Sequence, residues 1–265
     1  MKVAYLGPEG SYSSLAAKNL CPDCECVPKH GFYAVVASLL SKEVDCAVLP
    51  IENTLQGAVV QNLDLLYSNP DIYAVKEYVL KIDHRLITKK GVPLNKIKRI
   101  FSHEQAILQC GKFIAENMPD AQIFYTESTA QSILKLEDDF DAGIVGSHMQ
   151  KEGYSISEEN IADEKKNFTH FLLIKRGAES LLNNCERVYF AASCPHEPGA
   201  LLKMLHIIAD LGLNMTKIES RPKKNSPGEY SFFIEFEGNI SDEQVKNAIE
   251  KLRSYTKDFK LLGCY

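Results

Sequence analysis

The sequence predicts an α/β protein with two domains, a longer one over residues 1–177 and a smaller one over residues 187–265. Two observations predict this fold class. Strand-like and helix-like segments alternate over the first 150 residues, which is typical of mainly parallel sheets with helices on their faces. After a polar connector that follows Arg176, the order changes to βαββαβ, the ferredoxin-like order, over roughly 80 residues, the size of one small domain.

The first domain is expected to contain five strand–helix units. In each, a short strand-like apolar segment precedes a segment with the periodicity of a helix. The expected strands are 2–7, 45–50, 98–102, 122–126 and 141–146, and the helices that follow them are 13–20, 59–68, 104–117, 130–137 and 147–153.

A long alternating segment at 73–91 interrupts this rhythm and reads as a strand that carries the chain from one α/β lobe into another. We expect the second lobe to cover about 80–155, and the strand at 169–176 to return to the first lobe. Two lobes joined by two crossings would enclose a cleft, where ligands preferentially bind.

The second domain follows the ferredoxin-like order element by element. Its expected strands are 187–194, 214–222, 229–238 and 260–264, and its helices are 199–212 and 242–255.

The composition excludes several classes of protein. A net charge of −5 without a Lys/Arg stripe argues against a nucleic-acid partner, because phosphates require clustered cations. The content of 45% hydrophobic and 25% charged residues is typical of a soluble globular protein, and the longest apolar runs are far shorter than the roughly 20 residues that span a bilayer. The N-terminal segment lacks the features of an export signal, so we expect a cytoplasmic protein with no membrane partner.

Eight cysteines are scattered along the chain, and in a reducing compartment we expect free thiols rather than a disulfide framework. Cys21, Cys24 and Cys26 form the one cluster, which resembles half of a metal site. Zinc would require further ligands, and no matching Cys-x-x-Cys or His-x-x-x-His segment follows. We therefore expect a surface loop here and no metal.

Serines follow the expected strands of the first domain, where they can cap the next helix. The stretch Ser102–Gln105 also matches a capping box. In open α/β sheets the helix N-termini gather at the carboxyl ends of the strands, where free N–H groups and the helix dipole attract carboxylates. The other serines in such positions are Ser11, Ser13, Ser128 and Ser147.

Other polar residues cluster near the expected cleft. Gly7–Ser13 looks like a phosphate loop but lacks the Lys-Ser/Thr pair of a P-loop and the spacing of a dinucleotide fingerprint, which disfavours ATP and NAD. Glu52–Thr54 follow an apolar strand and offer a carboxylate, an amide and a hydroxyl to a ligand. The competing interpretation is an ordinary turn, in which Asn and Gly are common. Gln105 and Gln109 lie four residues apart on one helix face, either in solvent or toward a ligand.

Five segments, in this order, resemble the prephenate dehydratase family, and two later segments resemble the ACT regulatory domain attached to such enzymes. Together these segments cover essentially the whole chain. The five are Gly7–Ser13, Pro50–Val59, Ser102–Cys110, Glu127–Ser132 and Asn167–Phe171, and the two are Pro195–Leu205 and Asn214–Pro222.

The resemblance implies conversion of prephenate to phenylpyruvate with loss of water and carbon dioxide, in phenylalanine biosynthesis, without a metal or organic cofactor. It also implies a two-lobed, periplasmic-binding-protein-like catalytic domain with the active site in its cleft. Thr169 matches the family's catalytic threonine, and we expect its hydroxyl to donate to the leaving oxygen. The positions that resemble substrate contacts are Asn53, Thr54, Ser102, Gln109, Glu127, Ser128, Thr129, His170 and Phe171.

His170 departs from the family, which has arginine in this position. Arginine is always charged and binds carboxylates with two parallel hydrogen bonds, whereas histidine titrates near pH 6.5. Three outcomes remain open: another cation replaces the arginine, protonated His170 substitutes for it, or activity is weakened. We expect activity to be retained, because Thr169, Asn53 and Gln109 are present.

The ACT resemblance implies that L-phenylalanine is an effector, enclosed between segments of neighbouring subunits, and therefore a homodimer or homotetramer. The implied contacts are Gly199, Ala200, Leu201, Asn214, Glu219, Ser220, Arg221 and Pro222. The competing interpretation is that the glycine and proline only make a turn and that the arginine is a surface cation.

Two alternatives to a feedback-regulated dehydratase remain at this point. One is an enzyme that uses arogenate, or that decarboxylates prephenate without dehydration. The other is a non-catalytic amino-acid sensor. No helical chorismate mutase segment precedes the first strand, so we do not expect that activity in this chain.

Overall fold

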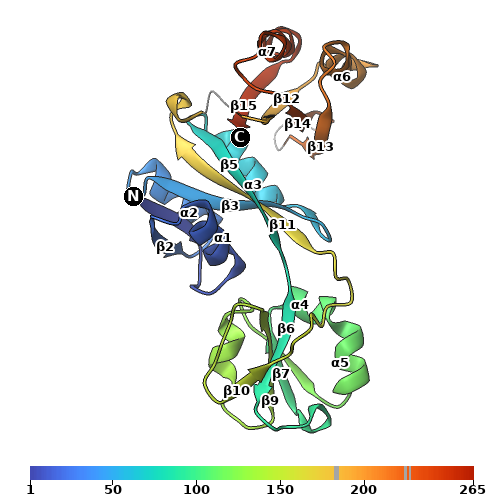
Figure 1. The fold of residues 1–265 in the computed structure, drawn as a ribbon. Helices are drawn as coiled ribbons and strands as arrows, with labels where there is room; N and C mark the ends of the chain where they lie inside the picture. The colour runs from blue at the N-terminus through green and yellow to red at the C-terminus, as the bar shows by residue number, and fades with distance from the viewer. Residues whose placement is uncertain (182–184, 224–225, 227) are drawn as a thin grey trace.

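The computed structural model describes residues 1–181, 185–223, 226 and 228–265, which form two sheets (Figure 1). The larger sheet has ten strands, with the path β13-β14-β12-β15-β5-β11-β3-β1-β2 and β4 paired to β3. The smaller sheet has five strands in the order β10-β6-β9-β7-β8. The two expected lobes and the C-terminal unit are therefore present, and the C-terminal unit shares a sheet with the first lobe.

The first lobe consists of a parallel trio of strands with helices on both faces. Ser11 caps its first helix, because the Ser11 Oγ accepts a hydrogen bond from the Ser14 N–H at 3.2 Å. One face of the sheet packs on α1, and the other packs on α2 and α3. The elements are β1 (Lys2–Leu6), α1 (Tyr12–Leu20), β2 (Glu25–Lys29), α2 (Phe32–Leu40), β3 (Cys46–Asn53), β4 (Gly57–Ala58) and α3 (Val60–Ser68).

Two long strands, β5 (Ile72–Lys81) and β11 (Phe168–Arg176), connect the first lobe to the second, as Figure 1 shows. β11 lies between β5 and β3 and runs antiparallel to both. The predicted crossings are confirmed. Parallel pairs form the core of each lobe, as predicted from the alternation of the first 150 residues, and one further parallel contact joins β15 to β5.

The second lobe is built around the five-stranded sheet. Its strands are β6 (His84–Lys89), β7 (Arg99–Ser102), β8 (Gln122–Tyr125), β9 (Asp141–Gly146) and β10 (Tyr154–Ile156), and its helical segments are η1 (Leu94–Lys96), α4 (Glu104–Gln109), α5 (Gly111–Asn117) and η2 (Gln131–Lys135). The helix expected at 104–117 is divided at Cys110, whose ψ of 20° departs from helical geometry. No helix forms at 147–153, where the chain turns instead.

The C-terminal unit has the predicted βαββαβ order after a short segment, η3 (Ala178–Ser180). Its two helices lie on the face of its sheet away from the first lobe (Figure 1). The elements are β12 (Arg187–Ser193), α6 (Ala200–Asp210), β13 (Met215–Pro222), β14 (Tyr230–Glu237), α7 (Glu243–Tyr255) and β15 (Asp258–Cys264).

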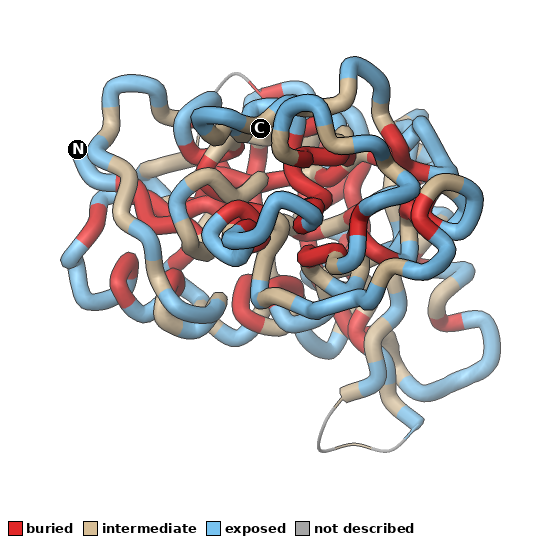
Figure 2. The backbone as a smooth tube through the Cα atoms, turned by 90° about the horizontal axis from the view of Figure 1, so that it is seen from below, coloured by how far each residue is buried: buried red, intermediate tan, exposed pale blue. Residues whose placement is uncertain are grey.

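A continuous hydrophobic core joins the C-terminal unit to the first lobe. Tyr189 and Phe233 are fully buried and belong to the same cluster as Leu65 and Leu66 of α3. The buried backbone lies inside a shell of exposed loops (Figure 2). Burial of a large apolar side chain contributes about 1.5–3 kcal/mol, so this contact holds the C-terminal unit firmly against the first lobe.

One cysteine expectation is corrected by the structure. Cys21 pairs with Cys24 and Cys185 with Cys264 as disulfides, whereas free thiols were expected. Cys21 and Cys24 lie in the turn between α1 and β2, as expected, whereas Cys26 lies on β2, and all three pack against the buried residues beneath α1. The strand β2 and the helix α2 were not predicted, because polar turns and short length weaken their periodicity.

No helix among the described residues is both long enough and apolar enough to cross a membrane.

Candidate active site

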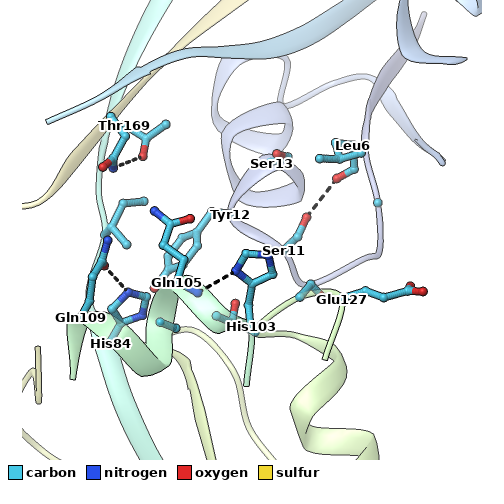
Figure 3. A pocket seen from close by; sticks show the side chains of 16 residues that line it. Leu6, Ser11, Tyr12, Ser13, His84, His103, Gln105, Gln109, Glu127 and Thr169 are labelled. Carbon is cyan, nitrogen blue, oxygen red and sulfur yellow. Dashed lines mark hydrogen bonds between the residues drawn. The ribbon is translucent and has the colours of Figure 1, made fainter. Parts of the chain in front are cut away.

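A cavity of about 200 Å³ lies between the two lobes, where β3 and β11 meet α1, α4 and the loop after β8 (Figure 3). Predicted and unpredicted residues share its wall. The lining residues are Leu6, Gly7, Ser11, Tyr12, Ser13, Asn53, Ile82, His84, His103, Gln105, Ala106, Gln109, Glu127, Ser128, Thr129 and Thr169.

Thr169 and Asn53 lie side by side in the wall of this cavity. They are cross-strand partners on β11 and β3, and the Asn53 Nδ2 donates to the Thr169 Oγ1 at 3.0 Å. The Asn53 Oδ1 accepts the backbone N–H groups of Leu55 and Gln56 at 3.1 and 3.2 Å, which fixes the amide with its nitrogen toward Thr169. Because the Thr169 oxygen already accepts a hydrogen bond, its own proton is left for donation into the cavity.

A chain of amide side chains continues from Asn53 across the cleft. The Asn53 Nδ2 also donates to the Asn167 Oδ1 at 2.7 Å, and the Asn167 Nδ2 donates to the Gln109 Oε1 at 3.0 Å. Gln109 belongs to α4 of the second lobe, while the two asparagines lie beside the first. The chain of hydrogen bonds therefore joins the two lobes beside Thr169.

His84, the first residue of β6, ends this chain of hydrogen bonds. Its Nε2 lies 2.9 Å from the Gln109 Oε1, an acceptor, so the Nε2 carries the proton. Burial lowers the pKa of His84 and outweighs the opposing effects of Gln109 and the Asp83 charge. The imidazole is therefore neutral at neutral pH and acts as a hydrogen-bond donor.

Tyr12 holds the first lobe against the second. Its hydroxyl donates to the backbone oxygen of Asp83 at 2.9 Å, and its ring contacts the edges of His84 and His148. Burial raises the pKa of Tyr12, so the hydroxyl keeps its proton. The His148 Nε2 adds a contact of 2.8 Å to the Gly10 backbone oxygen.

The expected helix caps are only partly present. Ser11 caps α1, and the Ser128 Oγ accepts from the Gln131 N–H at 3.2 Å. Ser102 does not cap α4: it is fully buried as the last residue of β7 and donates to the Ile144 backbone oxygen at 2.7 Å. His103 takes its place, with its Nδ1 3.2 Å from the Gln105 N–H, so the expected capping box is not formed.

Four of the predicted substrate contacts do not line the cavity. Thr54 pairs with the backbone at Phe168, Ser102 is buried in β7, and Phe171 packs in the core beneath α1. His170 faces the opposite side of the sheet, where its Nδ1 lies 2.8 Å from the Glu77 Oε1. The other predicted residues, Asn53, Gln109, Glu127, Ser128, Thr129 and Thr169, are brought together.

The electrostatic character of the cavity comes from neutral donors. Within the described part of the chain, the wall contains hydroxyl, amide and imidazole groups and one carboxylate, that of Glu127, but no Lys or Arg. The N-terminus of α1, capped by Ser11, adds backbone N–H groups and a positive dipole end. A carboxylate ligand would thus be held by hydrogen bonds and dipoles.

Sequence reasoning missed His84, Asn167 and Tyr12. Asn167 is buried and adjoins the motif of Thr169, but its inward position depends on the bend that leads into β11. His84 and Tyr12 are single polar residues in otherwise ordinary strand and helix patterns. Both residues lie where the two lobes meet, and the sequence alone does not show where that is.

The two segments expected to bind an effector lie in different parts of the C-terminal unit. Gly199 is the N-cap of α6, and its φ of +79° is a backbone conformation that favours glycine. Ala200 and Leu201 line a cavity of about 160 Å³, whereas Arg221 and Pro222 line a separate cavity of about 380 Å³ beside α3. Of the remaining expected contacts, Glu219 and Ser220 lie on β13, and the Asn214 Nδ2 donates to the Glu237 Oε2 at 3.0 Å.

Comparison with known proteins agrees with this arrangement. Residues 3–179 match the family model described as prephenate dehydratase, and residues 189–254 match the ACT domain. A bifunctional chorismate mutase/prephenate dehydratase from Buchnera aphidicola subsp. Acyrthosiphon pisum is 34% identical over 99% of this chain and 70% of its own length.

Two solved structures are closely similar over the whole chain. Prephenate dehydratase from Arthrobacter aurescens, in complex with L-Phe, has a TM-score of 0.88 at 30% identity, with 100% of this chain and 89% of that one covered. A structure described as GqqA, a quorum-quenching acylase, has a TM-score of 0.87 at 25% identity, with 100% and 97% covered.

The expected fold, a two-lobed periplasmic-binding-protein-like domain followed by an ACT domain, is therefore confirmed. The matched ranges cover nearly all of the described chain, and the cavity lies between the lobes of the first matched region. By sequence and by fold, this chain belongs to the prephenate dehydratase family and carries an ACT domain.

Proposed function

We propose that this protein converts prephenate to phenylpyruvate, carbon dioxide and water, and that Thr169 is the proton donor. The single observation that carries the proposal is the Thr169 hydroxyl in the interlobe cavity, with the Asn53 Nδ2 donating to its oxygen at 3.0 Å. No metal or organic cofactor enters the proposal, because ring aromatisation itself drives the departure of both groups.

The reaction requires one proton and a held geometry. The bond between the ring and its carboxylate breaks and releases carbon dioxide, and the electron pair enters the ring as the C–O bond of the ring alcohol breaks. Thr169 gives its proton to the departing oxygen, which leaves as water, and solvent returns a proton to Thr169. The Asn53 N–H stabilises the negative charge that develops on the Thr169 oxygen.

Neutral donors hold the substrate in this proposal. Gln109, Ser128 and Thr129 line the wall of the second lobe, and the N-terminus of α1 faces the same cavity. Among the described residues of the wall, Glu127 is the acidic one, but its side chain is exposed and accepts a hydrogen bond from the Gln131 Nε2 at 2.9 Å. Position 170 lies outside the cavity, which supports retained activity despite the absence of the family's arginine.

We further propose that the ACT domain, residues 187–265, binds L-phenylalanine and regulates the catalytic domain, residues 1–177. The L-Phe complex of the Arthrobacter aurescens structure supports the choice of ligand. Ala200 and Leu201 line one cavity of the chain and Arg221 and Pro222 line another, so a site that uses both segments requires a second protomer. The exposed Ile218 of the edge strand β13 supports a homodimer.

The geometry favours dehydration over acyl transfer, the activity named for one of the similar structures. An acyl-transfer nucleophile requires an adjacent base that removes its proton. Within the described residues, the Thr169 oxygen instead accepts a hydrogen bond from the Asn53 amide. This contact favours a hydroxyl that keeps its proton until the transition state.

The proposal is tested by incubating the purified protein with prephenate and identifying the product by absorbance and mass. Phenylpyruvate is expected. A decarboxylated product that retains the ring alcohol would instead indicate a decarboxylase, and faster turnover of arogenate would indicate an arogenate dehydratase. No turnover of either compound, combined with binding of L-phenylalanine in calorimetry, would support the amino-acid sensor and reject the proposed reaction.

A further inference from the structure

The two central residues of the cavity each have a sequence neighbour that faces the ACT domain. Asn53 pairs with Thr169 across β3 and β11, and Glu52 pairs with His170 in the same register. Side chains alternate between the faces of a strand, so Glu52 and His170 leave the sheet on the face opposite the cavity. This is the face whose core includes Tyr189 of the ACT domain.

A chain of charged groups leads from His170 into the ACT domain. The His170 Nδ1 lies 2.8 Å from the Glu77 Oε1, and the Arg187 Nη1 donates to the Glu77 Oε2 at 3.0 Å. Arg187 also lies 3.5 Å from the Glu235 Oε1, which accepts from the Thr216 Oγ1 at 2.5 Å. The path begins beside Thr169 on β11 and ends on β13 of the ACT domain.

A second path is shorter. The Lys217 Nζ on β13 donates to the Glu52 Oε2 on β3, and Glu52 immediately precedes Asn53. Lys217 lies two residues before Glu219, the first residue of the segment proposed to bind L-phenylalanine. Both paths therefore join β13 to the backbone that carries Asn53 and Thr169.

These contacts are sheltered enough to transmit a displacement. One partner of each pair is sheltered: the side chains of Lys217, Glu77 and Glu235 are 13%, 15% and 6% exposed, against 36% for Glu52 and 38% for Arg187. Water therefore screens these pairs less than it screens fully exposed pairs. Burial alone would raise the pKa of Glu77, but its hydrogen bond to His170 and the nearby charges of His170 and Arg187 lower it overall. The Glu77 carboxylate therefore stays ionised and can bind His170 and Arg187 at the same time.

The backbone beside Asn53 is the point where a displacement would alter the site. The Asn53 amide is oriented by the N–H groups of Leu55 and Gln56, all within one tight loop. A shift of Glu52 would change this loop and with it the direction of the Asn53 Nδ2 toward Thr169. Substrate contacts on the far wall, such as Gln109, would stay in place.

We propose that Glu52, Glu77, His170 and Lys217 are positioning residues, which couple the position of ACT strand β13 to the alignment of Asn53 with Thr169. The regulatory part of this inference rests on the proposed binding of L-phenylalanine at β13. The coupling is reciprocal: closing the active site shifts the ACT domain by the same free energy with which the effector shifts the site.

The test compares four variants of the full chain. Lys217→Met and Glu77→Gln each remove one charge and keep the side-chain length. Glu52→Lys combined with Lys217→Glu reverses the ion pair and should restore it. Lys89→Met is the matched control, because Lys89 forms an ion pair with Asp139 in the second lobe, remote from the ACT domain.

Hydrogen–deuterium exchange of a peptide that covers residues 51–57 is the first measurement, because the amides of Leu55 and Gln56 report the orientation of Asn53. Without ligand, this peptide should exchange at least about threefold faster in Lys217→Met and Glu77→Gln than in the wild type, and at the wild-type rate in Lys89→Met and the charge-reversed pair. Equal exchange in all variants would overturn the proposal, whatever the protein catalyses.

Addition of L-phenylalanine is the second measurement, with binding followed in parallel by calorimetry. In the wild type, the effector should change the exchange of this peptide and the kcat for prephenate. In Lys217→Met, binding should persist while both responses fall by about fivefold or more, the lower range of typical coupling.

A wild-type response of both exchange and kcat to L-phenylalanine in Lys217→Met would reject the proposed coupling between β13 and the Asn53–Thr169 pair. Coupled exchange without prephenate turnover would reject the proposed reaction and leave the link standing. If the wild type binds no L-phenylalanine, the effector assignment fails, and the ligand-free exchange of the variants alone decides the link.

Discussion

Thr169 and His170 are neighbours on β11 whose side chains leave the ten-stranded sheet on opposite faces. The Thr169 hydroxyl lies in the interlobe cavity, 3.0 Å from the Asn53 Nδ2, and the His170 imidazole lies 2.8 Å from Glu77 on the face that the ACT domain covers. One strand thus carries both the proposed proton donor and a residue on the face that the ACT domain covers.

The Thr169 hydroxyl is the group that the proposed chemistry cannot lose. Thr169→Val keeps the shape and removes the proton donor, so kcat for prephenate should fall by about a hundredfold or more while KM changes little. Thr169→Ser keeps the hydroxyl and should retain a substantial part of the activity. Steady-state kinetics of both variants decide this, and a Thr169→Val enzyme with wild-type kcat would remove Thr169 from the mechanism.

Asn53 should matter through the direction of its amide. Asn53→Asp places an acceptor where the Nδ2 donates to Thr169 and Asn167, so the stabilisation of the Thr169 oxygen is lost. Loss of one such donor typically lowers kcat by about a hundred- to a thousandfold. The control is circular dichroism and thermal unfolding, which separate this effect from misfolding. Unchanged kcat in a folded Asn53→Asp protein would contradict the assigned role.

The sequence predicted most of the elements in their order, though not β2 or α2, and several residues of the cavity wall, because ordered motifs and strand periodicity are local signals. Thr169, Asn53, Gln109 and Ser128 were placed correctly in the cavity. His170 lies outside the cavity, and alternation along the strand accounts for this, because a residue adjacent to an inward-facing threonine faces outward.

The contacts made by His84, Tyr12 and Lys217 could not be predicted in this way. Each links elements that are distant in the chain: Tyr12 reaches Asp83, and Lys217 reaches Glu52, 165 residues away. Ser102 illustrates the same limit at short range. A serine before a helix is a good cap by local chemistry, but strand β7 extends through it and the hydroxyl is used to bond β9.

A substitution of His170 distinguishes a structural role for this residue from contact with the substrate. His170→Ala removes a hydrogen bond to a partly buried carboxylate, so the free energy of unfolding should fall by about 1.5–3 kcal/mol. KM for prephenate should stay within about twofold, because the imidazole does not reach the cavity. Denaturant unfolding and kinetics on the same preparation test both parts. A large rise in KM with unchanged stability would show that position 170 does contact the substrate.

The buried His84 should make stability depend on pH. Its pKa is lowered in the folded state, mainly by burial, so as the pH falls through about 6.5 the unfolded chain takes up a proton before the folded one. Stability contributed by neutral His84 is therefore complete above that pH and is lost below it. Each unit by which the folded pKa lies below the unfolded value corresponds to about 1.4 kcal/mol.

His84→Gln tests this directly, because a glutamine amide can still donate to the Gln109 Oε1 but does not titrate. Between pH 7.5 and 5, the free energy of unfolding should fall more steeply in the wild type than in the variant, with the difference confined to the acid end. Other carboxylates and histidines titrate equally in both proteins, so they cancel in the comparison. Parallel curves over the whole range would mean that His84 takes up its proton equally in both states, and hence that the interlobe chain does not require a neutral imidazole.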